Sequence, residues 1–306
     1  MNQPGRRAPI VVGVDGSRAA LDALDWAAAE AAIRRRPLRV VHAFAWPGAL
    51  DRFGVFTGTA DYGCRAGAEQ VLEEAVTRAR SVTPDGDVTP WLAIGAAAPA
   101  MLEQALDADL IVLGNRGFGR LRGLISPSVG VQVVACATCP VAIVHPFHRV
   151  PPGPSVARVV VGVGDSTQSI DAIGYAFQAA AQRGVGLTAV HAWAPRGPAD
   201  LEGDVDDAAA AEYRERRLLQ GALAGWIGQF PDVTVEPKLV RARPAHALIT
   251  ESAGAALTVV GSRGRGVVRG ALLGSVSQML LRHAHSPVAV LRADLASTGS
   301  RMSAGT

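Results

Sequence analysis

Residues 261–275 read GSRGRGVVRGALLGS, which places five glycines within fifteen residues. The apolar run LTVV at 257–260 precedes them and is typical of a buried parallel strand, whereas VSQMLLRHA at 276–284 has the amphipathic period of a helix. In a parallel α/β sheet, the carboxyl ends of strands and the amino ends of helices face the same crevice, where phosphate groups bind. The pattern therefore predicts a strand-to-helix loop, which is either a phosphate-binding loop or a flexible surface turn.

The length and composition favour a soluble protein of two domains. A chain of 306 residues suits two domains that each bury a core, and none of its apolar runs reaches the unbroken length of a membrane span. The N-terminal segment MNQPGRRAPIVVGVDGS has two arginines before an apolar run, but Gly13 and Asp15 cut that run short of a signal-peptide core. We therefore expect a cytoplasmic protein.

The charged and sulfur-containing residues argue against several functions. A formal charge of +3 is mild, and we expect the basic run Arg34-Arg35-Arg36 to end a helix and face solvent rather than nucleic acid. The pair Cys136 and Cys139 closes a predicted helix, whereas redox pairs of this spacing open one. With Cys64 these are the three cysteines of the chain, so we expect neither a disulfide framework nor a zinc site.

The chain contains one unit twice. IVVGVDGSRAALDAL (10–24) corresponds to VVVGVGDSTQSIDAI (159–173), and His42 corresponds to His191, both at an offset of 149. LIVLGNRGFGRLRGLISPS (110–128) then corresponds to 257–275, and CPVAIV (139–144) to SPVAVL (286–291), at an offset of 147. We predict a first domain at 1–146, a stiff proline-rich linker at 147–157, a second domain at 158–293 and a disordered tail at 294–306.

Each copy alternates predicted strands and helices. In the first, the strand PIVVGV leads to a helix with Ser17 as its N-cap, then to the strand LRVVHAF, a loop of about twenty residues and the helix AGAEQVLEEAVTRARSV. The strand DVTPWLAI, a helix around PAMLEQAL, the strand DLIVLG, the glycine loop, a helix and a last strand follow. This alternation predicts two tandem α/β domains, each a doubly wound, Rossmann-like parallel sheet with right-handed crossovers.

The motifs resemble a known family. Gly261, Gly264, Gly274 and Ser275 are spaced as in the G-2x-G-9x-G-[S/T] nucleotide loop of the universal stress protein family. A first strand ending in VGVDGS and last strands opening with CPV or SPV are also similar to that family. The resemblance covers almost the whole chain twice, so the chain looks like a tandem universal stress protein of the ATP-binding class.

The resemblance implies an ATP site in each domain, with or without Mg²⁺. The family uses an acid after the first strand for adenine, a main-chain group after the second strand, and the glycine loop for ribose and phosphates. In the first half these positions are Asp15, Ala43, Gly114, Gly117, Ser128 and Val129, and in the second half they are Ala192, Gly261, Gly264, Gly274, Ser275 and Val276. Arg116 and Arg263, inside the two loops, either pair with phosphates or face solvent.

Each half departs from the family pattern at a different place. Pro127 stands where the second half has Gly274, so one backbone N–H is missing and φ is fixed near −65°. Gly164 stands at the aligned position of Asp15, with Asp165 displaced by one residue as either an adenine contact or a helix N-cap. The phosphate grip is thus weakened in the first half, and the adenine contact in the second.

Three classes of function fit these features. The first is a nucleotide-dependent regulator in the stress response, the second a slow ATP hydrolase without the P-loop lysine, and the third a scaffold that has lost its nucleotide. His42 and His191 suggest catalysis, but no motif pairs them with a nucleophile, which favours a structural role. The resemblance also implies that the last strands at 141–144 and 288–291 pair as an internal pseudo-dimer, with a homodimer as a further option. We expect no nucleic-acid or membrane partner.

Overall fold

The computed structural model describes residues 7–44, 60–115, 128–145, 158–164, 167–193, 205–262 and 273–292. The chain divides into two compact units, Met1–Phe147 and His148–Thr306. The predicted linker at 147–157 and tail at 294–306 lie outside the described residues, so the domain boundaries drawn from the repeat stay a prediction.

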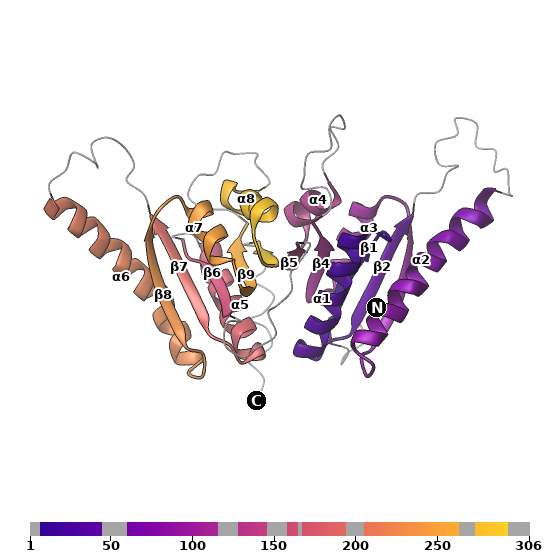
Figure 1. Cartoon of the computed structure of the whole chain (residues 1–306), viewed down its shortest axis with the longest axis horizontal. Coiled ribbons are helices and arrows are strands. Elements are labelled where there is room, and N and C mark those ends of the chain that lie inside the picture. Colours follow the sequence, from indigo (N-terminus) through magenta and orange to yellow (C-terminus); the bar gives the residue numbers. More distant parts are fainter. Residues whose placement is uncertain are drawn as a thin grey trace. The chain divides into compact units, whose positions relative to one another are not determined.

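The first unit is a five-stranded parallel sheet with helices on both faces (Figure 1). Its strands, in the spatial order β3-β2-β1-β4-β5, are β1 (Ile10–Val14), β2 (Leu38–Phe44), β3 (Val88–Ile94), β4 (Leu110–Gly114) and β5 (Val141–Val144). Its helices are α1 (Arg18–Arg34), α2 (Ala60–Val82), α3 (Ala97–Gln104) and α4 (Val129–Cys136).

The second unit repeats this architecture. Its strands, in the order β8-β7-β6-β9-β10, are β6 (Arg158–Gly162), β7 (Leu187–Trp193), β8 (Val235–Arg241), β9 (Ala255–Gly261) and β10 (Val288–Leu291), and all are parallel. Its helices are α5 (Thr167–Arg183), α6 (Val205–Gln229), α7 (Pro244–Glu251) and α8 (Ser275–His283). The prediction of two doubly wound α/β units is confirmed.

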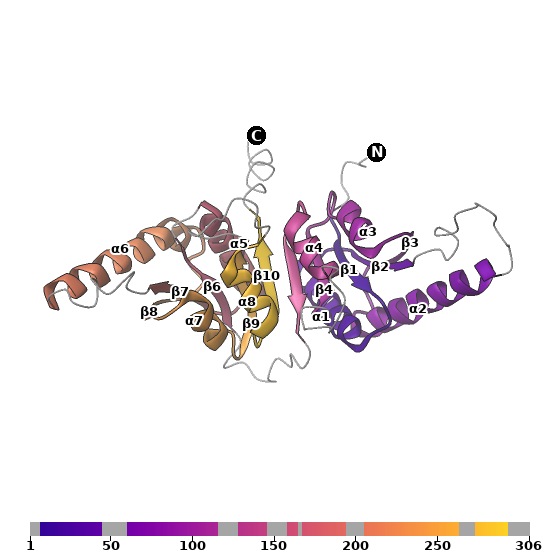
Figure 2. The same cartoon turned by 90° about the horizontal axis from the view of Figure 1, so that it is seen from above.

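The helices form two layers around each sheet. In the first unit α1 and α2 pack together on one face, and α3 and α4 pack on the other; α5 with α6 and α7 with α8 do the same in the second unit (Figure 2). The alternating buried strand residues Ile10 and Val12 pack with Leu24 and small alanines of α1 such as Ala27. Small side chains on α1 let the helix lie close to the strands, which fixes the position of the strand ends.

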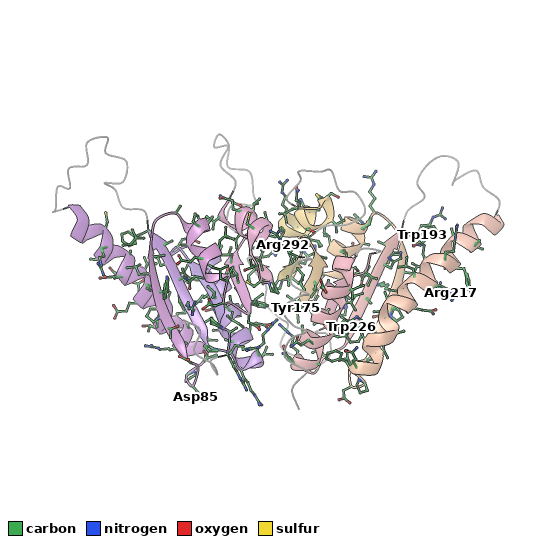
Figure 3. All side chains as sticks on the ribbon, turned by 180° about the vertical axis from the view of Figure 1, so that it is seen from behind. Asp85, Tyr175, Trp193, Arg217, Trp226 and Arg292 are labelled. Atoms are coloured by element: carbon green, nitrogen blue, oxygen red, sulfur yellow. The ribbon has the colours of Figure 1, made fainter. Side chains whose placement is uncertain are left out.

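The two units fill the space between their paired helices in different ways. In the first, Arg78 of α2 donates from Nε and Nη2 to the Asp25 carboxylate of α1 at 2.7 and 2.6 Å, and this hydrogen bond raises the pKa of Arg78. The second unit has Gly174 at the position of Asp25, and the Trp226 ring of α6 packs against it. Trp226 is labelled in Figure 3, and its ring centroid lies 6.4 Å from those of both Phe177 and Phe230.

A proline interrupts each outer strand. Pro90 of β3 pairs in register with Val40 of β2, and Pro237 of β8 pairs with Ala189 of β7. Proline has no N–H, and within sheets it is tolerated on edge strands where its nitrogen faces away from the neighbour. Both strands are edge strands of their unit in this sheet order.

Two sequence-based expectations are wrong in detail. Helix α2 begins at Ala60, six residues before the predicted AGAEQ start, so part of the expected loop is helical. Arg34 does not face solvent: its side chain is only 5 % exposed, and it contacts Glu30 at 2.5 Å and Asp109 at 3.2 Å. These two carboxylates offset the cost of burying the guanidinium, which the position of the residue at a helix end did not reveal.

Candidate functional site

The candidate site lies at the edge of each sheet where the parallel strands have their carboxyl ends. Helices α4 and α8 begin at this edge, which is the upper edge in Figure 1. In the first unit β1 lies between β2 and β4, and the helices that follow β1 and β4 cover opposite faces of the sheet. This is a topological switch point, where open α/β sheets bind ligands.

Asp15 follows β1 and shapes the start of α1. Its Oδ1 accepts a hydrogen bond from the backbone N–H of Ser17 at 3.0 Å, and Gly16 between them has a φ of 76°. The Ser17 hydroxyl in turn accepts from the N–H of Ala20, as expected of an N-cap. The carboxylate of Asp15 is exposed at the edge and is held by its own turn.

Ala43 and Ala192 are placed alike in the two units. Each is the next-to-last residue of its strand and is half-buried, and their strand partners are Ala93 and Val240. Both residues thus lie close to the carboxyl end of their strand. This placement is compatible with a main-chain contact to a base.

Gly114, the last residue of β4, is a glycine for a packing reason. A Cβ atom there would lie 2.6 Å from the carbonyl carbon of Ala19 in the first turn of α1. The end of β4 therefore lies directly against the first turn of α1. The contact with α1 is therefore enough to explain why this position is a glycine, whether or not a ligand binds nearby.

The first turn of α4 is capped from within the chain. Ser128 is the N-cap, and its Oγ accepts a hydrogen bond from the N–H of Val131 at 3.3 Å. Val129 is the first helical residue and is partly exposed. One of the amides that an anion would use is thus already bound.

The first turn of α8 is arranged differently. Its N-cap is Gly274, which has no side chain to cap the helix, and the exposed Ser275 and half-buried Val276 begin the helical residues. The N–H of Gly274 donates to the carbonyl of Ser262 at 2.8 Å, and the Ser277 hydroxyl donates to the carbonyl of Gly261 at 2.9 Å. These two bonds tie the end of β9 to the start of α8, and no side chain of the described residues caps the first-turn amides.

The two helices begin one residue apart in the alignment of the repeats. Gly274 is the N-cap of α8 and has a φ of −69°, which proline also adopts. The N-cap of α4 is Ser128, the residue aligned with Ser275. Pro127 itself lies outside the described residues.

Gly164 stands at the position of Asp15 in the second unit, and its backbone N–H is hydrogen-bonded to a side chain of the following helix. Its N–H donates to the hydroxyl of the buried Ser169 at 2.8 Å, so a serine of α5 takes part in the turn that Asp15 and Ser17 make in the first unit. No atom of the described residues lies within 4 Å of the position that a Cβ of Gly164 would occupy. Asp165 lies outside those residues.

The two histidines in register occupy equivalent places with different partners. Nδ1 of His42 lies 2.8 Å from the carbonyl of Val14, and Nδ1 of His191 lies 2.9 Å from the carbonyl of Val163. Nε2 of His191 also lies 2.8 Å from Oε2 of Glu215 on α6. Both histidines thus brace the end of the first strand of their unit, which is consistent with a structural role.

Several predicted residues are not tested by this geometry. Gly117, Gly264, Arg116 and Arg263 lie outside the described residues. Sequence reasoning missed Ser169 and Glu215, because each contacts a residue that the motif does not include. An alignment of α2 with α6 at an offset of 147 would have revealed Glu215, because the aligned residue in the first unit is the apolar Ala68.

Neither the cysteines nor a cluster of acids adds a second kind of site. Burial raises the pKa of the Cys139 thiol to about 12, while Cys136 and Cys64 are exposed, and all three are free thiols. Among the described residues, no three His, Cys, Asp or Glu side chains gather as a metal ion would require. No helix in the described ranges combines the length and apolar character needed to cross a membrane.

The fold and the repeated strand-to-helix edge define a tandem doubly wound α/β protein. The profile of the Universal stress protein family matches residues 7–145 and again 156–292. The chain therefore belongs to the universal stress protein family, with two copies of the family domain, and the resemblance read from the motifs is confirmed.

Relatives that match almost the whole chain are also universal stress proteins. Universal stress protein Rv2005c of Mycobacterium tuberculosis is 40% identical over 300 residues, covering 95% of this chain and 99% of that protein. Universal stress protein Rv2623 of the same organism is 37% identical over 293 residues, covering 94% and 97%. A universal stress protein structure from Archaeoglobus fulgidus superposes with a TM-score of 0.65 at 20% identity, over 93% of this chain and 96% of that one, which supports the fold.

Proposed function

We propose that this protein binds ATP at the carboxyl edge of its second unit and acts as a nucleotide-dependent regulator in the stress response. The observation that carries the proposal is the first turn of α8, whose N-cap Gly274 provides no side-chain hydrogen bond. Free amides at a helix N-terminus, together with the helix dipole, form a site for phosphate oxygens. Family membership makes a nucleotide the natural source of those phosphates.

The first unit fits ATP less well. It has the acid of the family pattern, Asp15, but the Ser128 hydroxyl already occupies the Val131 amide at the helix that would face the phosphates. Pro127 removes a further N–H from the loop. We therefore expect the second unit to bind more tightly, with the first unit weak or empty.

Regulation is favoured over hydrolysis for a chemical reason. Rapid phosphoryl transfer needs a cation such as the P-loop lysine to neutralise developing charge, and neither glycine loop contains a lysine. The histidines nearest the edge are engaged with main-chain carbonyls. Mg²⁺ would bind through the phosphates of the nucleotide, and cytoplasmic action without nucleic-acid or membrane partners remains part of the proposal.

The last strands supply a proposed internal interface. By the family resemblance, we expect β5 and β10 to pair within one chain as a pseudo-dimer, which can itself form a homodimer. Both strands are short and apolar, with the sequences VAIV and VAVL. Such strands expose hydrogen-bonding groups unless another strand covers them.

Calorimetric titration with ATP tests the proposed site. The unmodified protein should bind about one ATP per chain. Gly274→Pro should weaken binding, because it removes the N–H that ties the start of α8 to the Ser262 carbonyl while keeping a backbone compatible with a φ of −69°. Pro127→Gly is the matched reverse change and should strengthen the first unit without affecting the second. Two equal sites would contradict the asymmetry, no binding would support a scaffold, and sustained phosphate release would support a hydrolase.

A further inference from the structure

Each unit has an acidic residue near the carboxyl ends of its strands, but the two acids stand at different positions of the repeat. In the first unit the acid Asp15 follows the first strand, and the aligned helix position carries the buried Ala68. In the second unit the strand position is Gly164, and the helix position carries Glu215. The helix alignment is anchored by the buried pair Leu72 and Leu219, which are also 147 positions apart.

His191 brings Glu215 to the strand end. Its Nδ1 lies 2.9 Å from the carbonyl of Val163, the residue directly before Gly164, and its Nε2 lies 2.8 Å from Oε2 of Glu215. One buried imidazole ring therefore spans from the chain beside Gly164 to the helix carboxyl group. The carboxyl group of Glu215 thus reaches from α6 to a side chain near the end of β7.

The hydrogen-bond arrangement leaves one oxygen of Glu215 available. The Val163 carbonyl can only accept, so Nδ1 donates to it, and a proton must also lie between Nε2 and Oε2. None of the described residues donates to Oε1 of Glu215, whose side chain is 24% exposed. This oxygen can accept a hydrogen bond from a ligand.

The surroundings suit a flat ring. Among the described residues, no atom lies within 4 Å of where a side chain of Gly164 would begin. Trp193 lies two residues after His191 on β7 and thus on the same face of the sheet; it is labelled in Figure 3. The guanidinium of Arg241 lies 5.6 Å from the Trp193 ring centroid, which orients the indole beside the strand ends.

We propose that Glu215, positioned by His191, replaces the missing acid of the second unit and accepts a hydrogen bond from the 6-amino group of adenine. This inference rests on the proposed ATP site and adds the residue that selects the base. A carboxylate oxygen accepts from an amino group and repels a carbonyl oxygen. The second unit should therefore prefer adenine over a purine that carries a 6-oxo group.

Competition between ATP and inosine triphosphate tests the role of Glu215. The two nucleotides differ at the 6-position, and the measurement is the ratio of their Kd values in an Asp15→Asn background, where the first unit has no carboxylate after its first strand. We expect ATP to bind at least about tenfold more tightly, as one hydrogen bond to a charged group allows. Glu215→Gln, whose amide can donate to the 6-oxo group, should bring the ratio close to one or reverse it.

Glu212→Gln is the matched control, because Glu212 is an exposed acid on the same helix whose partner is Arg216. It should leave the ratio unchanged, and Glu215→Ala should lower the ratio without favouring inosine triphosphate. If ATP binds but Glu215→Gln keeps the original ratio, the role of Glu215 is overturned while the ATP site stands. If the unmodified protein binds no ATP, the proposed function fails, and the role of Glu215 fails with it.

Discussion

At Gly114 the chain leaves no room for a side chain. A Cβ atom would lie 2.6 Å from the Ala19 carbonyl carbon, whereas non-bonded carbon atoms are most stable at about 3.5–4.0 Å. The backbone of α1 or β4 would have to move, so we expect Gly114→Ala to lower the free energy of unfolding by roughly 1–3 kcal/mol. Denaturant unfolding followed by circular dichroism measures this change.

Gly164→Ala is the control for that substitution. Gly164 also lies close to the end of a strand, but no atom of the described residues lies within 4 Å of its Cβ position and its φ is not positive. We expect little change in stability there. Equal effects of the two substitutions would show that the close contact with Ala19 is not what requires Gly114.

The three thiols should differ in reactivity. Burial raises the pKa of Cys139 to about 12, so it stays protonated at pH 8 and should react slowly with iodoacetamide, whereas the exposed Cys64 and Cys136 should react readily. Because the folded pKa is the higher one, this thiol favours the folded state less as pH rises from its unfolded value near 8.5 toward 12. Peptide mass spectrometry after timed labelling would contradict the prediction if Cys139 reacted as fast as Cys136.

Between α5 and α6, the fit of Trp226 against Gly174 should be sensitive to one methyl group. A Cβ on Gly174 would lie 2.7 Å from Cζ2 of the Trp226 ring, which packs with the rings of Phe177 and Phe230. Gly174→Ala should therefore destabilise the second unit by roughly 1–3 kcal/mol, since the indole would have to shift within this ring cluster. Thermal unfolding followed by tryptophan fluorescence is the measurement.

Gly221→Ala supplies a control of opposite sign. Gly221 lies within α6, and no atom lies within 4 Å of its Cβ position. Alanine is a better helix former than glycine by about 1 kcal/mol, so this change should stabilise the unit. Destabilisation at both positions would point to a general intolerance of α6 and not to the contact with Trp226.

The elements themselves were largely predictable because their signals are local. The strand LRVVHAF was predicted with the bounds that β2 has, and Ser17 was predicted as the N-cap of α1. The start of α2 was missed because glycine at position 63 made Ala60–Gly63 resemble a loop. Packing from the remainder of the helix overrides that weak local preference.

Contacts between distant residues could not be predicted in the same way. Arg34 was expected to face solvent because its partner Asp109 lies 75 positions away in the sequence. His191 and Glu215 were each visible as residues, but their 2.8 Å contact depends on how α6 packs against β7. The glycine motif indicated which residues lie in the two strand-to-helix loops. The difference in capping between α4 and α8 became visible only in the structure, where Ser128 and Gly274 are the two N-caps.

For the whole molecule, the proposed pairing of β5 with β10 has a measurable consequence. Separately produced segments 1–147 and 148–306 follow the division of the chain into two compact units. Each would expose an apolar last strand, so each should self-associate into dimers, and mixing the two should favour a heterodimer. Size-exclusion chromatography with light scattering that shows both segments as stable monomers would contradict the pairing.

The prolines of the outer strands affect whether a further strand can add to the sheet at those edges. Pro90 and Pro237 each remove a hydrogen-bond donor from the middle of an edge strand, so a foreign β-strand cannot dock there along its full length. The missing donors therefore disfavour edge-to-edge association at β3 and at β8.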